Sequence, residues 1–246
     1  MVNNHIVSFV GYIHLTLLFR TSLFTSPAKS SLTTLPSSYS NELIISFNSL
    51  ISGCENWSST FACLVISIVG EYGKTGILFD INKIINSLEY EEGRIVNENF
   101  TGEVNKDVRK SNVKWIYPTN ETMWLFTKLM KVIQSVNGQL WNFELIMARE
   151  PIQYTEYEDN GEYGWHIDTG HGPSAQRKVS VSVLLTNPDE YEGGDLELWP
   201  GGEIKRVERK QYTMTIFPSC ILHRVTPVTK GVRKSLVFWV GGTPYR

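Results

Sequence analysis

After Gly138 the sequence breaks into short segments rich in β-branched and aromatic residues, separated by glycine and proline turns. Val179, Val181 and Val183 alternate with Ser180 and Ser182, and this period of two predicts a strand with one buried face. Many short strands with such turns are typical of two packed antiparallel sheets, so we predict a double-sheet jelly roll. The predicted strands cover residues 143–148, 152–157, 178–185, 196–199, 212–217 and 235–240.

Two amphipathic helices are predicted before these strands. Asp80 is a good N-cap for a helix over about residues 80–90, whose apolar stripe consists of Ile81, Ile84, Ile85 and Leu88. Thr119 or Asn120 caps a second helix, which Asn137 and Gly138 end and whose buried face is formed by Phe126, Leu129, Ile133 and Val136. The two helices can cover a sheet, so the fold class is mainly β with flanking helices.

Residues 1–76 differ from the remainder, and we treat them as an N-terminal extension of unknown role before a domain at 77–246. Residues 1–40 contain no Asp or Glu, and 11 of the 20 residues at 21–40 are Ser or Thr. The apolar run at 6–19 is 14 residues long, short of the roughly 20 needed to cross a bilayer. Its length suits a secretory signal, but no basic stretch precedes it, so a targeting signal remains an alternative to a plain extension.

Net charge and cysteine content limit which binding partners and which cellular compartment we expect. The formal net charge is −2 for 246 residues. This charge is inconsistent with the broad basic surface expected of a protein that binds nucleic acid or an anionic membrane. Three cysteines make a disulfide framework improbable and favour a reducing compartment, so we expect a cytoplasmic protein with neither nucleic acid nor membrane as a partner. The oligomeric state is open.

Three potential metal ligands occur in the β-rich region. If residues 163–168 form a strand, His166 and Asp168 project from the same face. His223 lies 55 residues beyond Asp168, far enough to cross the sandwich and return opposite. Two imidazoles and one carboxylate leave three positions of an octahedron open, as non-haem Fe(II) requires for a cosubstrate and oxygen. The alternative is that His166 and Asp168 are surface residues and His223 is a core histidine.

Arg233 follows His223 by ten residues, at the start of an apolar strand. A guanidinium that enters a barrel is costly unless it meets an anion, and its planar fork suits a carboxylate. A dicarboxylate cosubstrate satisfies this requirement. The alternative is an ion pair with an acidic side chain at the rim of the sandwich.

In combination, these segments resemble the 2-oxoglutarate- and Fe(II)-dependent dioxygenases, and within them the prolyl 4-hydroxylase-like, PKHD-type hydroxylases. The resemblance lies in His-x-Asp, the distal histidine, the arginine ten residues later and a Gly-Gly-Asp-Leu turn, in that order, and it extends over about residues 77–246. It is seen at 108–115, 153–157, 161–168, 191–196, 216–228 and 231–235.

The resemblance implies a double-stranded β-helix core of cupin-like type and specific residue roles. His166, Asp168 and His223 would bind iron, and Arg233 would bind the distal carboxylate of 2-oxoglutarate with help from the Ser235 hydroxyl. Tyr157 is the first choice for a cosubstrate-binding tyrosine. Tyr154 and Tyr163 are its rivals for that role.

The implied activity is that of an oxidoreductase that hydroxylates an unactivated C–H bond with Fe(II), 2-oxoglutarate and O2, with ascorbate as a reductant, and releases succinate and CO2. A carboxylate at Asp168 favours hydroxylation over halogenation, because halogenating relatives have a small residue there. The expected substrate is a prolyl or other side chain of a polypeptide. A small metabolite or free amino acid, a binding module without turnover and a hydrolytic zinc site are the alternatives. His171 and Cys220 are not expected to bind metal.

Overall fold

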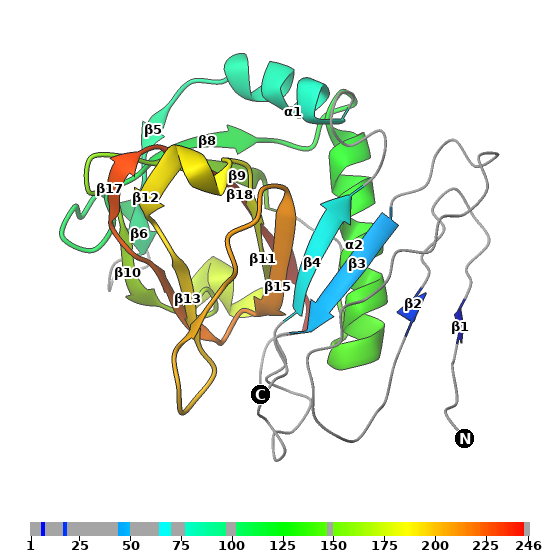
Figure 1. Cartoon of the computed structure of the whole chain (residues 1–246). Helices are drawn as coiled ribbons and strands as arrows, with labels where there is room; N and C mark the ends of the chain where they lie inside the picture. Colours follow the sequence, from blue (N-terminus) through cyan, green and yellow to red (C-terminus); the bar gives the residue numbers. More distant parts are fainter. Residues whose placement is uncertain are drawn as a thin grey trace.

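The computed structural model of the protein describes residues 6–7, 17–18, 44–49, 64–69, 77–96, 102–146 and 150–243 (Figure 1). Two antiparallel sheets form the centre of the molecule. The larger, or major, sheet has the order β3-β4-β15-β11-β18-β9-β8-β5, and the smaller, or minor, sheet has the order β10-β16-β13-β14. This is the predicted double-stranded β-helix.

The strands of the major sheet are β3 (Ile44–Ser49), β4 (Leu64–Val69), β5 (Glu91–Glu92), β8 (Asn112–Ile116), β9 (Ile152–Tyr157), β11 (Arg177–Leu184), β15 (Thr213–Pro218) and β18 (Arg233–Gly241). Those of the minor sheet are β10 (Tyr163–His166), β13 (Leu196–Trp199), β14 (Lys205–Arg206) and β16 (Leu222–Val225). Three short pairs join β1 (Ile6–Val7) to β2 (Leu17–Leu18), β6 (Ile95–Val96) to β7 (Gly102–Glu103), and β12 (Tyr191–Gly193) to β17 (Val228–Gly231). Within the described residues, 3-10 turns occupy Gly172–Gln176 and Pro188–Glu190.

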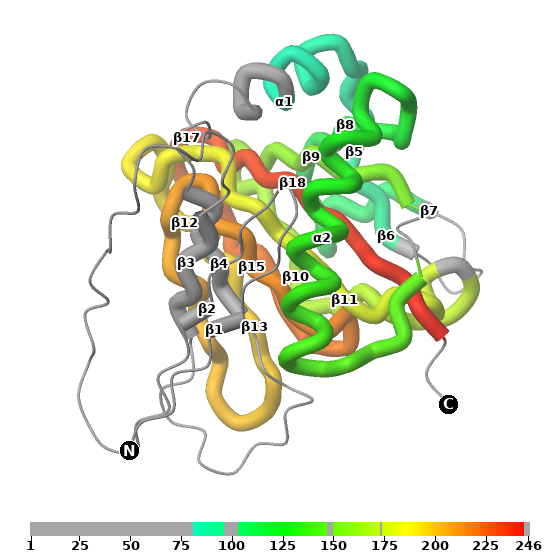
Figure 2. The backbone as a smooth tube through the Cα atoms, turned by 90° about the vertical axis from the view of Figure 1, so that its right-hand side faces the viewer, coloured from blue at the N-terminus to red at the C-terminus, as the bar shows by residue number. Residues whose placement is uncertain are grey.

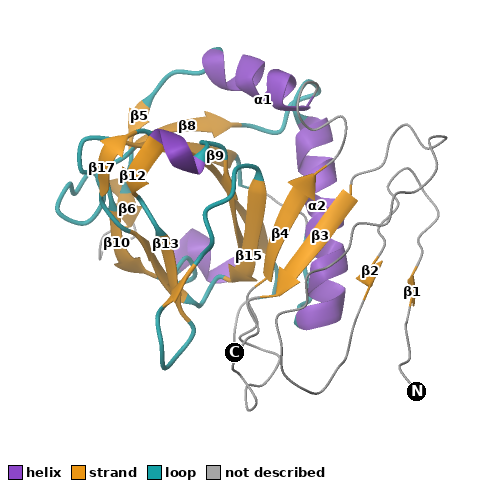
Figure 3. Cartoon of the chain, in the orientation of Figure 1, coloured by secondary structure: helices purple, strands orange, loops and turns teal. Residues whose placement is uncertain are grey.

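Two α-helices, α1 (Ile77–Asn86) and α2 (Met123–Leu140), cover the outer face of the major sheet (Figures 2 and 3). The predicted stripe of α2 is confirmed, since Phe126, Leu129, Ile133 and Val136 are buried. Helix α1 begins three residues before Asp80, so Asp80 is not its N-cap. No helix in the described part of the chain is long and apolar enough to span a membrane.

The end of α2 differs from the prediction. The helix continues past Gly138, and the Asn137 side chain forms hydrogen bonds with the loop that follows instead of ending the helix. Asn137 Nδ2 donates to the Phe143 carbonyl, and Asn137 Oδ1 accepts from the Phe143 amide, both at 2.9 Å. Asn142 supplies the left-handed turn, with φ of 51°, and its amide donates to the Asn137 carbonyl. This loop replaces most of the strand predicted at 143–148, where Leu145 forms only an isolated bridge to Gly242.

Strand β11 positions the site because its two faces meet different surroundings. Val179, Val181 and Val183 belong to the hydrophobic core that the sheet shares with the helices. Ser180 and Ser182 line a cavity on the opposite face, between the sheets. The alternation of valine and serine therefore separates a packing face from a face that contains the site.

The predicted strands at 152–157 and 196–199 are confirmed as β9 and β13, and those at 178–185, 212–217 and 235–240 are confirmed with shifted ends. Strand β8, near the edge of the major sheet, was not predicted. The segment before residue 77 contributes β3 and β4, and β4 pairs with β15. The division at residue 77 remains a prediction, and the Ser/Thr-rich segment at 21–40 lies outside the described residues.

Candidate metal centre and pocket

His166, Asp168 and His223 come together between the two sheets, with one potential ligand atom from each within 4.8 Å of the others. His166 ends β10 and is paired in register with His223 on β16. Asp168 lies beyond the end of β10, so the strand predicted at 163–168 is too long. Asp168 still faces the two imidazoles, because its amide donates to the Ser219 carbonyl at 2.9 Å and holds the turn in place.

Both imidazoles are oriented for metal binding. The Nδ1 of His166 lies 2.7 Å from the Gly164 carbonyl, and the Nδ1 of His223 lies 2.8 Å from the Ile221 carbonyl. Because a carbonyl only accepts, each Nδ1 carries the proton and each Nε2 presents a lone pair. These Nε2 atoms lie 3.7 and 3.4 Å from the carboxylate oxygens of Asp168. A transition metal between them would find two neutral imidazoles and a carboxylate.

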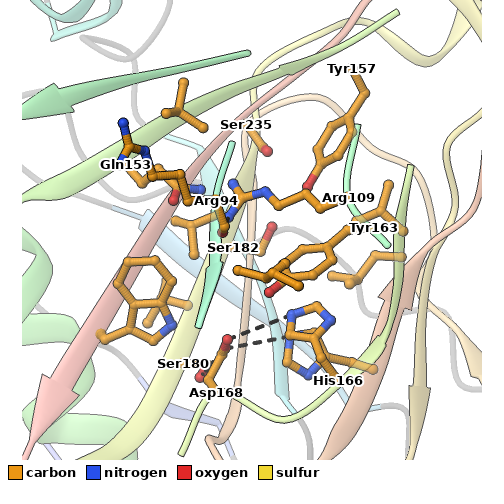
Figure 4. A pocket seen from close by; sticks show the side chains of 18 of the residues that line it. Arg94, Arg109, Gln153, Tyr157, Tyr163, His166, Asp168, Ser180, Ser182 and Ser235 are labelled. Atoms are coloured by element: carbon orange, nitrogen blue, oxygen red, sulfur yellow. Dashed lines mark hydrogen bonds and ion pairs between the residues drawn. The ribbon is translucent and has the colours of Figure 1, made fainter. Parts of the chain in front are cut away.

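The Asp168 carboxylate is buried and held from a second side. Ser180, which lies beside Asp168 in Figure 4, donates from its Oγ to Asp168 Oδ2 at 2.6 Å. The same hydroxyl lies 2.9 Å from Ser219 Oγ. Burial alone would raise the pKa of Asp168, but His223, His166 and Arg177 hold it below its usual range. Burial and the neighbouring His223 lower the pKa of His166. Asp168 is therefore held as a carboxylate and His166 as a neutral imidazole, the protonation states that a metal requires.

Aromatic rings fix the positions of both histidines. The Tyr163 ring stacks on His166 with centroids 3.5 Å apart and an interplanar angle of 16°. Phe217 meets the edge of His223 at 4.9 Å. Beyond Tyr163 lies Arg109, whose Cζ is 4.7 Å from the tyrosine ring. The histidines are thus packed against side chains that limit their rotation.

A cavity of about 240 Å³ extends from these three residues to Arg233, Ser235 and Tyr157. Arg233 is 4% exposed, its Nη1 donates to Ser235 Oγ at 3.0 Å, and its Cζ lies 5.7 Å from the Tyr157 ring. No acidic side chain among the described residues forms an ion pair with Arg233, so the alternative of a partner at the rim finds no support here. The guanidinium instead faces a space that an anion can enter.

The structure separates the three tyrosines considered for the cosubstrate. Tyr154 belongs to the helix-side core, and its hydroxyl donates to Glu156, outside the cavity. Tyr157 and Tyr163 both line the cavity. Tyr157 is paired in register with Arg233, and burial raises its pKa. Tyr157 is therefore placed to share a ligand with Arg233, whereas Tyr163 lies over a histidine.

Three further residues of the site were not predicted from the sequence. Ser180 bonds Asp168, Arg177 donates to the Asp168 carbonyl at 3.3 Å, and Arg109 lines the cavity. Only Arg109 had a sequence signal, because it lies in the 108–115 segment of the resemblance. His171 is exposed, and neither it nor Cys220 belongs to the metal-ligand group found in the described residues.

Comparison with known proteins shows which families the chain resembles. Residues 152–241 match the family model of the 2OG-Fe(II) oxygenase superfamily. Two PKHD-type hydroxylases are similar over 37% of the chain: one from Acidovorax ebreus, 35% identical over 96 residues, and one from Xylella fastidiosa, 37% identical over 100 residues. The matches cover 42% and 44% of those proteins, so the chain matches less than half of their length. The expected resemblance to PKHD-type 2OG-Fe(II) oxygenases is confirmed.

Solved structures show the same fold. A Trichoplax adhaerens prolyl hydroxylase, in complex with a hypoxia inducible factor oxygen degradation domain peptide fragment, has a TM-score of 0.60 and 19% identity, covering 75% of this chain and 84% of that one. A Pseudomonas putida prolyl-4-hydroxylase has a TM-score of 0.55 and 17% identity, and the match covers 74% of this chain and 92% of that one. At these identities the comparison establishes the double-stranded β-helix and leaves the substrate to be argued separately.

Proposed function

We propose that this chain, whose residues 152–241 match the 2OG-Fe(II) oxygenase superfamily, is an Fe(II)- and 2-oxoglutarate-dependent dioxygenase that hydroxylates an unactivated C–H bond. The observation that carries the proposal is the presence in one cavity of three convergent potential metal ligands and of a buried Arg233 that has no acidic partner among the described residues. A hydrolytic zinc site would explain the ligands, but it would leave Arg233 without a role. The cofactor is Fe(II), and the cosubstrates are 2-oxoglutarate and O2.

The donor set fits ferrous iron. His166, Asp168 and His223 would hold the metal, which when bound couples oxygen activation to the decarboxylation of 2-oxoglutarate into succinate and CO2. The protein supplies orientation and charge. Gly164 and Ile221 fix the imidazole tautomers through their carbonyls, and Ser180 fixes the carboxylate.

Arg233 and Ser235 would bind the distal carboxylate of 2-oxoglutarate, and Tyr157 would complete that end of the pocket. The Arg233 guanidinium can form two parallel hydrogen bonds to a carboxylate, and Ser235 already holds it in position at 3.0 Å. Burial strengthens this interaction because water is excluded. Asp168, as a carboxylate, supports hydroxylation as the outcome.

For the substrate we propose a prolyl or other side chain of a polypeptide, as in the Trichoplax adhaerens complex, whose partner is a peptide fragment. The second candidate is a small metabolite or free amino acid, since substrate choice rests on loops around the metal that fold comparison does not settle. Ascorbate is the proposed reductant. The low cysteine content keeps the cytoplasm as the proposed compartment.

The experiment begins with anaerobic protein, Fe(II) and 2-oxoglutarate, for which we expect a weak visible metal-to-ligand charge-transfer band. Substitution Arg233→Ala should weaken 2-oxoglutarate binding while metal binding persists. A succinate-release screen over peptides, free amino acids and other metabolites then identifies the substrate. A fully metallated protein without the band would contradict the proposed site, and oxygen-dependent succinate release from no compound would favour a binding module.

A further inference from the structure

Arg109 places a second buried guanidinium in the same cavity. It is 6% exposed, its Nε donates to Ser111 Oγ at 3.0 Å and its Nη1 donates to the Arg94 carbonyl at 3.0 Å. Its Nη2 is buried and has no hydrogen-bond partner. Figure 4 shows the guanidinium in the interior of the cavity, beside Tyr157 and above Tyr163. Its hydrogen-bond partners among the described residues are therefore neutral, and one donor group is left for a ligand.

The charge of Arg109 has no counter-ion in the described part of the chain. No acidic side chain there forms an ion pair with Arg109. Glu92 lines the same cavity, but its Oε1 forms an ion pair with Lys106 Nζ at 2.7 Å. Arg177 provides the contrast, because it lines the cavity but is paired with Glu150. The contact of the guanidinium with the Tyr163 ring offsets only part of the cost of burying an unpaired charge.

Iron and 2-oxoglutarate do not supply the missing charge. Asp168 and the two carboxylates of 2-oxoglutarate balance the ferrous ion and Arg233, so the charge of Arg109 remains when the proposed site is filled. The distal carboxylate of the cosubstrate already has Arg233 and Ser235. A further anion would balance this charge, and the remaining molecule that enters the pocket is the substrate.

The position of Arg109 suits substrate binding near the reaction centre. Tyr163 lies between Arg109 and His166 (Figure 4). The centroid of its ring is 3.5 Å from the centroid of the His166 imidazole and 4.7 Å from Arg109 Cζ. A group bound by Arg109 is thus separated from a metal ligand by one aromatic ring. A side chain of a few bonds would reach from this anchor toward the metal.

We propose that Arg109 binds a carboxylate of the substrate, so that the enzyme acts on a carboxylate-bearing molecule whose oxidised carbon lies a few bonds from that carboxylate. The inference rests on the proposed function and narrows its substrate class. The carboxylate can belong to an α-amino acid with a free carboxyl end or to an acidic residue of a peptide. Both sources present the same planar anion to the unpartnered Nη2.

The experiment measures binding, not turnover. Anaerobic protein loaded with Fe(II) and 2-oxoglutarate is titrated calorimetrically with the N-acetyl derivatives of the twenty amino acids and with their amides. A second arm uses the end-blocked dipeptides Pro-Asp and Asp-Pro and their Asn counterparts. In at least one pair we expect the acid to bind about tenfold more tightly than the neutral form, the scale of one charge-assisted hydrogen bond. The arm that shows the preference identifies the source of the carboxylate.

The variants assign the preference to one residue. Arg109→Gln should reduce the acid-to-amide ratio to within twofold of unity, and Lys110→Gln, which removes an exposed charge next to it, should retain the ratio. Arg109→Lys keeps the charge and the contact with Tyr163, so it should keep the preference with weaker affinity, and it replaces Arg109→Gln if that variant does not fold.

Two results would overturn the inference. One is the absence of any acid preference in both arms. The other is a loss of 2-oxoglutarate affinity in Arg109→Gln as large as in Arg233→Gln, which would assign Arg109 to the cosubstrate. The charge-transfer band of the wild-type protein separates these failures from failure of the proposed function, because the band requires only iron and 2-oxoglutarate.

Discussion

At the residue scale, the proposed metal centre includes a serine that is not one of its three candidate ligands. Ser180 reaches Asp168 Oδ2 from the major sheet, while the ligands themselves belong to the minor sheet and its turns. This hydrogen bond fixes one carboxylate oxygen and leaves the other to approach a metal. Hydrogen bonds of this kind commonly change metal affinity by 10–100-fold.

Ser180→Ala should therefore raise the dissociation constant for Fe(II) by about tenfold or more, because Asp168 loses its orienting donor. Anaerobic titration with Fe(II) or Co(II) measures the effect. Ser182→Ala is the matched control, since Ser182 lies on the same face of β11 and lines the same cavity without a hydrogen bond to Asp168. Equal affinities of the two variants would show that Ser180 does not orient the carboxylate.

Tyr157→Phe tests the choice among the tyrosines. We propose that the Tyr157 hydroxyl donates to the distal carboxylate of 2-oxoglutarate, so its removal should weaken cosubstrate binding by about tenfold, the value of a hydrogen bond to a charged group. Tyr154→Phe should leave that affinity unchanged, because Tyr154 belongs to the helix-side core. Titration of the charge-transfer band measures both. A larger loss in Tyr163→Phe than in Tyr157→Phe would reverse the assignment.

Among the site residues, those with a fixed order and spacing could be predicted from the sequence. His166, Asp168, His223 and Arg233 form such a series, and the structure brings them into one cavity. Ser180 could not be found this way, since its hydrogen bond to Asp168 depends on how the turn after β10 packs against β11. The alternation of valine and serine predicts which face of the strand Ser180 lies on, but it does not indicate that the hydroxyl bonds to Asp168.

At the scale of elements, α2 is joined to the sheet by Asn137. The side chain of this residue satisfies both backbone groups of Phe143, which turns the chain toward β9. The pair Asn137 and Gly138 predicts a helix stop, because this pair is a common helix ending. Local sequence could not reveal that the amide has a partner six residues later, which allows the helix to continue.

Asn137→Ala should lower the free energy of unfolding by about 1–3 kcal/mol, because two partly buried backbone groups of Phe143 lose their partner. Urea denaturation measures the change. Gln139→Ala is the control, as Gln139 is exposed and bonds only within α2, so its effect should stay within about 0.5 kcal/mol. Equal effects would mean that the Asn137 bonds do not join the helix to the loop.

At the scale of the whole molecule, the two faces of the major sheet divide stability from chemistry. One face packs on α1 and α2, and the other forms the cavity with the minor sheet. For β11 this division follows from the alternation of valine and serine and could be predicted from the sequence. The order of the strands in the sheet could not be predicted, because the pairing of strands that are joined by long loops leaves no periodic signal in the sequence.

The order of the strands in the major sheet gives the last prediction. Strands β3 and β4 lie at one edge and join the sheet through β15, whereas Ser180, Arg233 and Tyr157 lie on β11, β18 and β9. A chain that begins at Gly76 should thus bind Fe(II) and 2-oxoglutarate with affinities within about twofold of the full chain. It should also unfold at lower denaturant and associate more readily, because the edge of β15 becomes exposed. Calorimetric titration and light scattering measure the two properties. A truncated chain that unfolds cooperatively but binds no metal would show that residues 1–75 are part of the active unit, and the division at residue 77 would then be wrong.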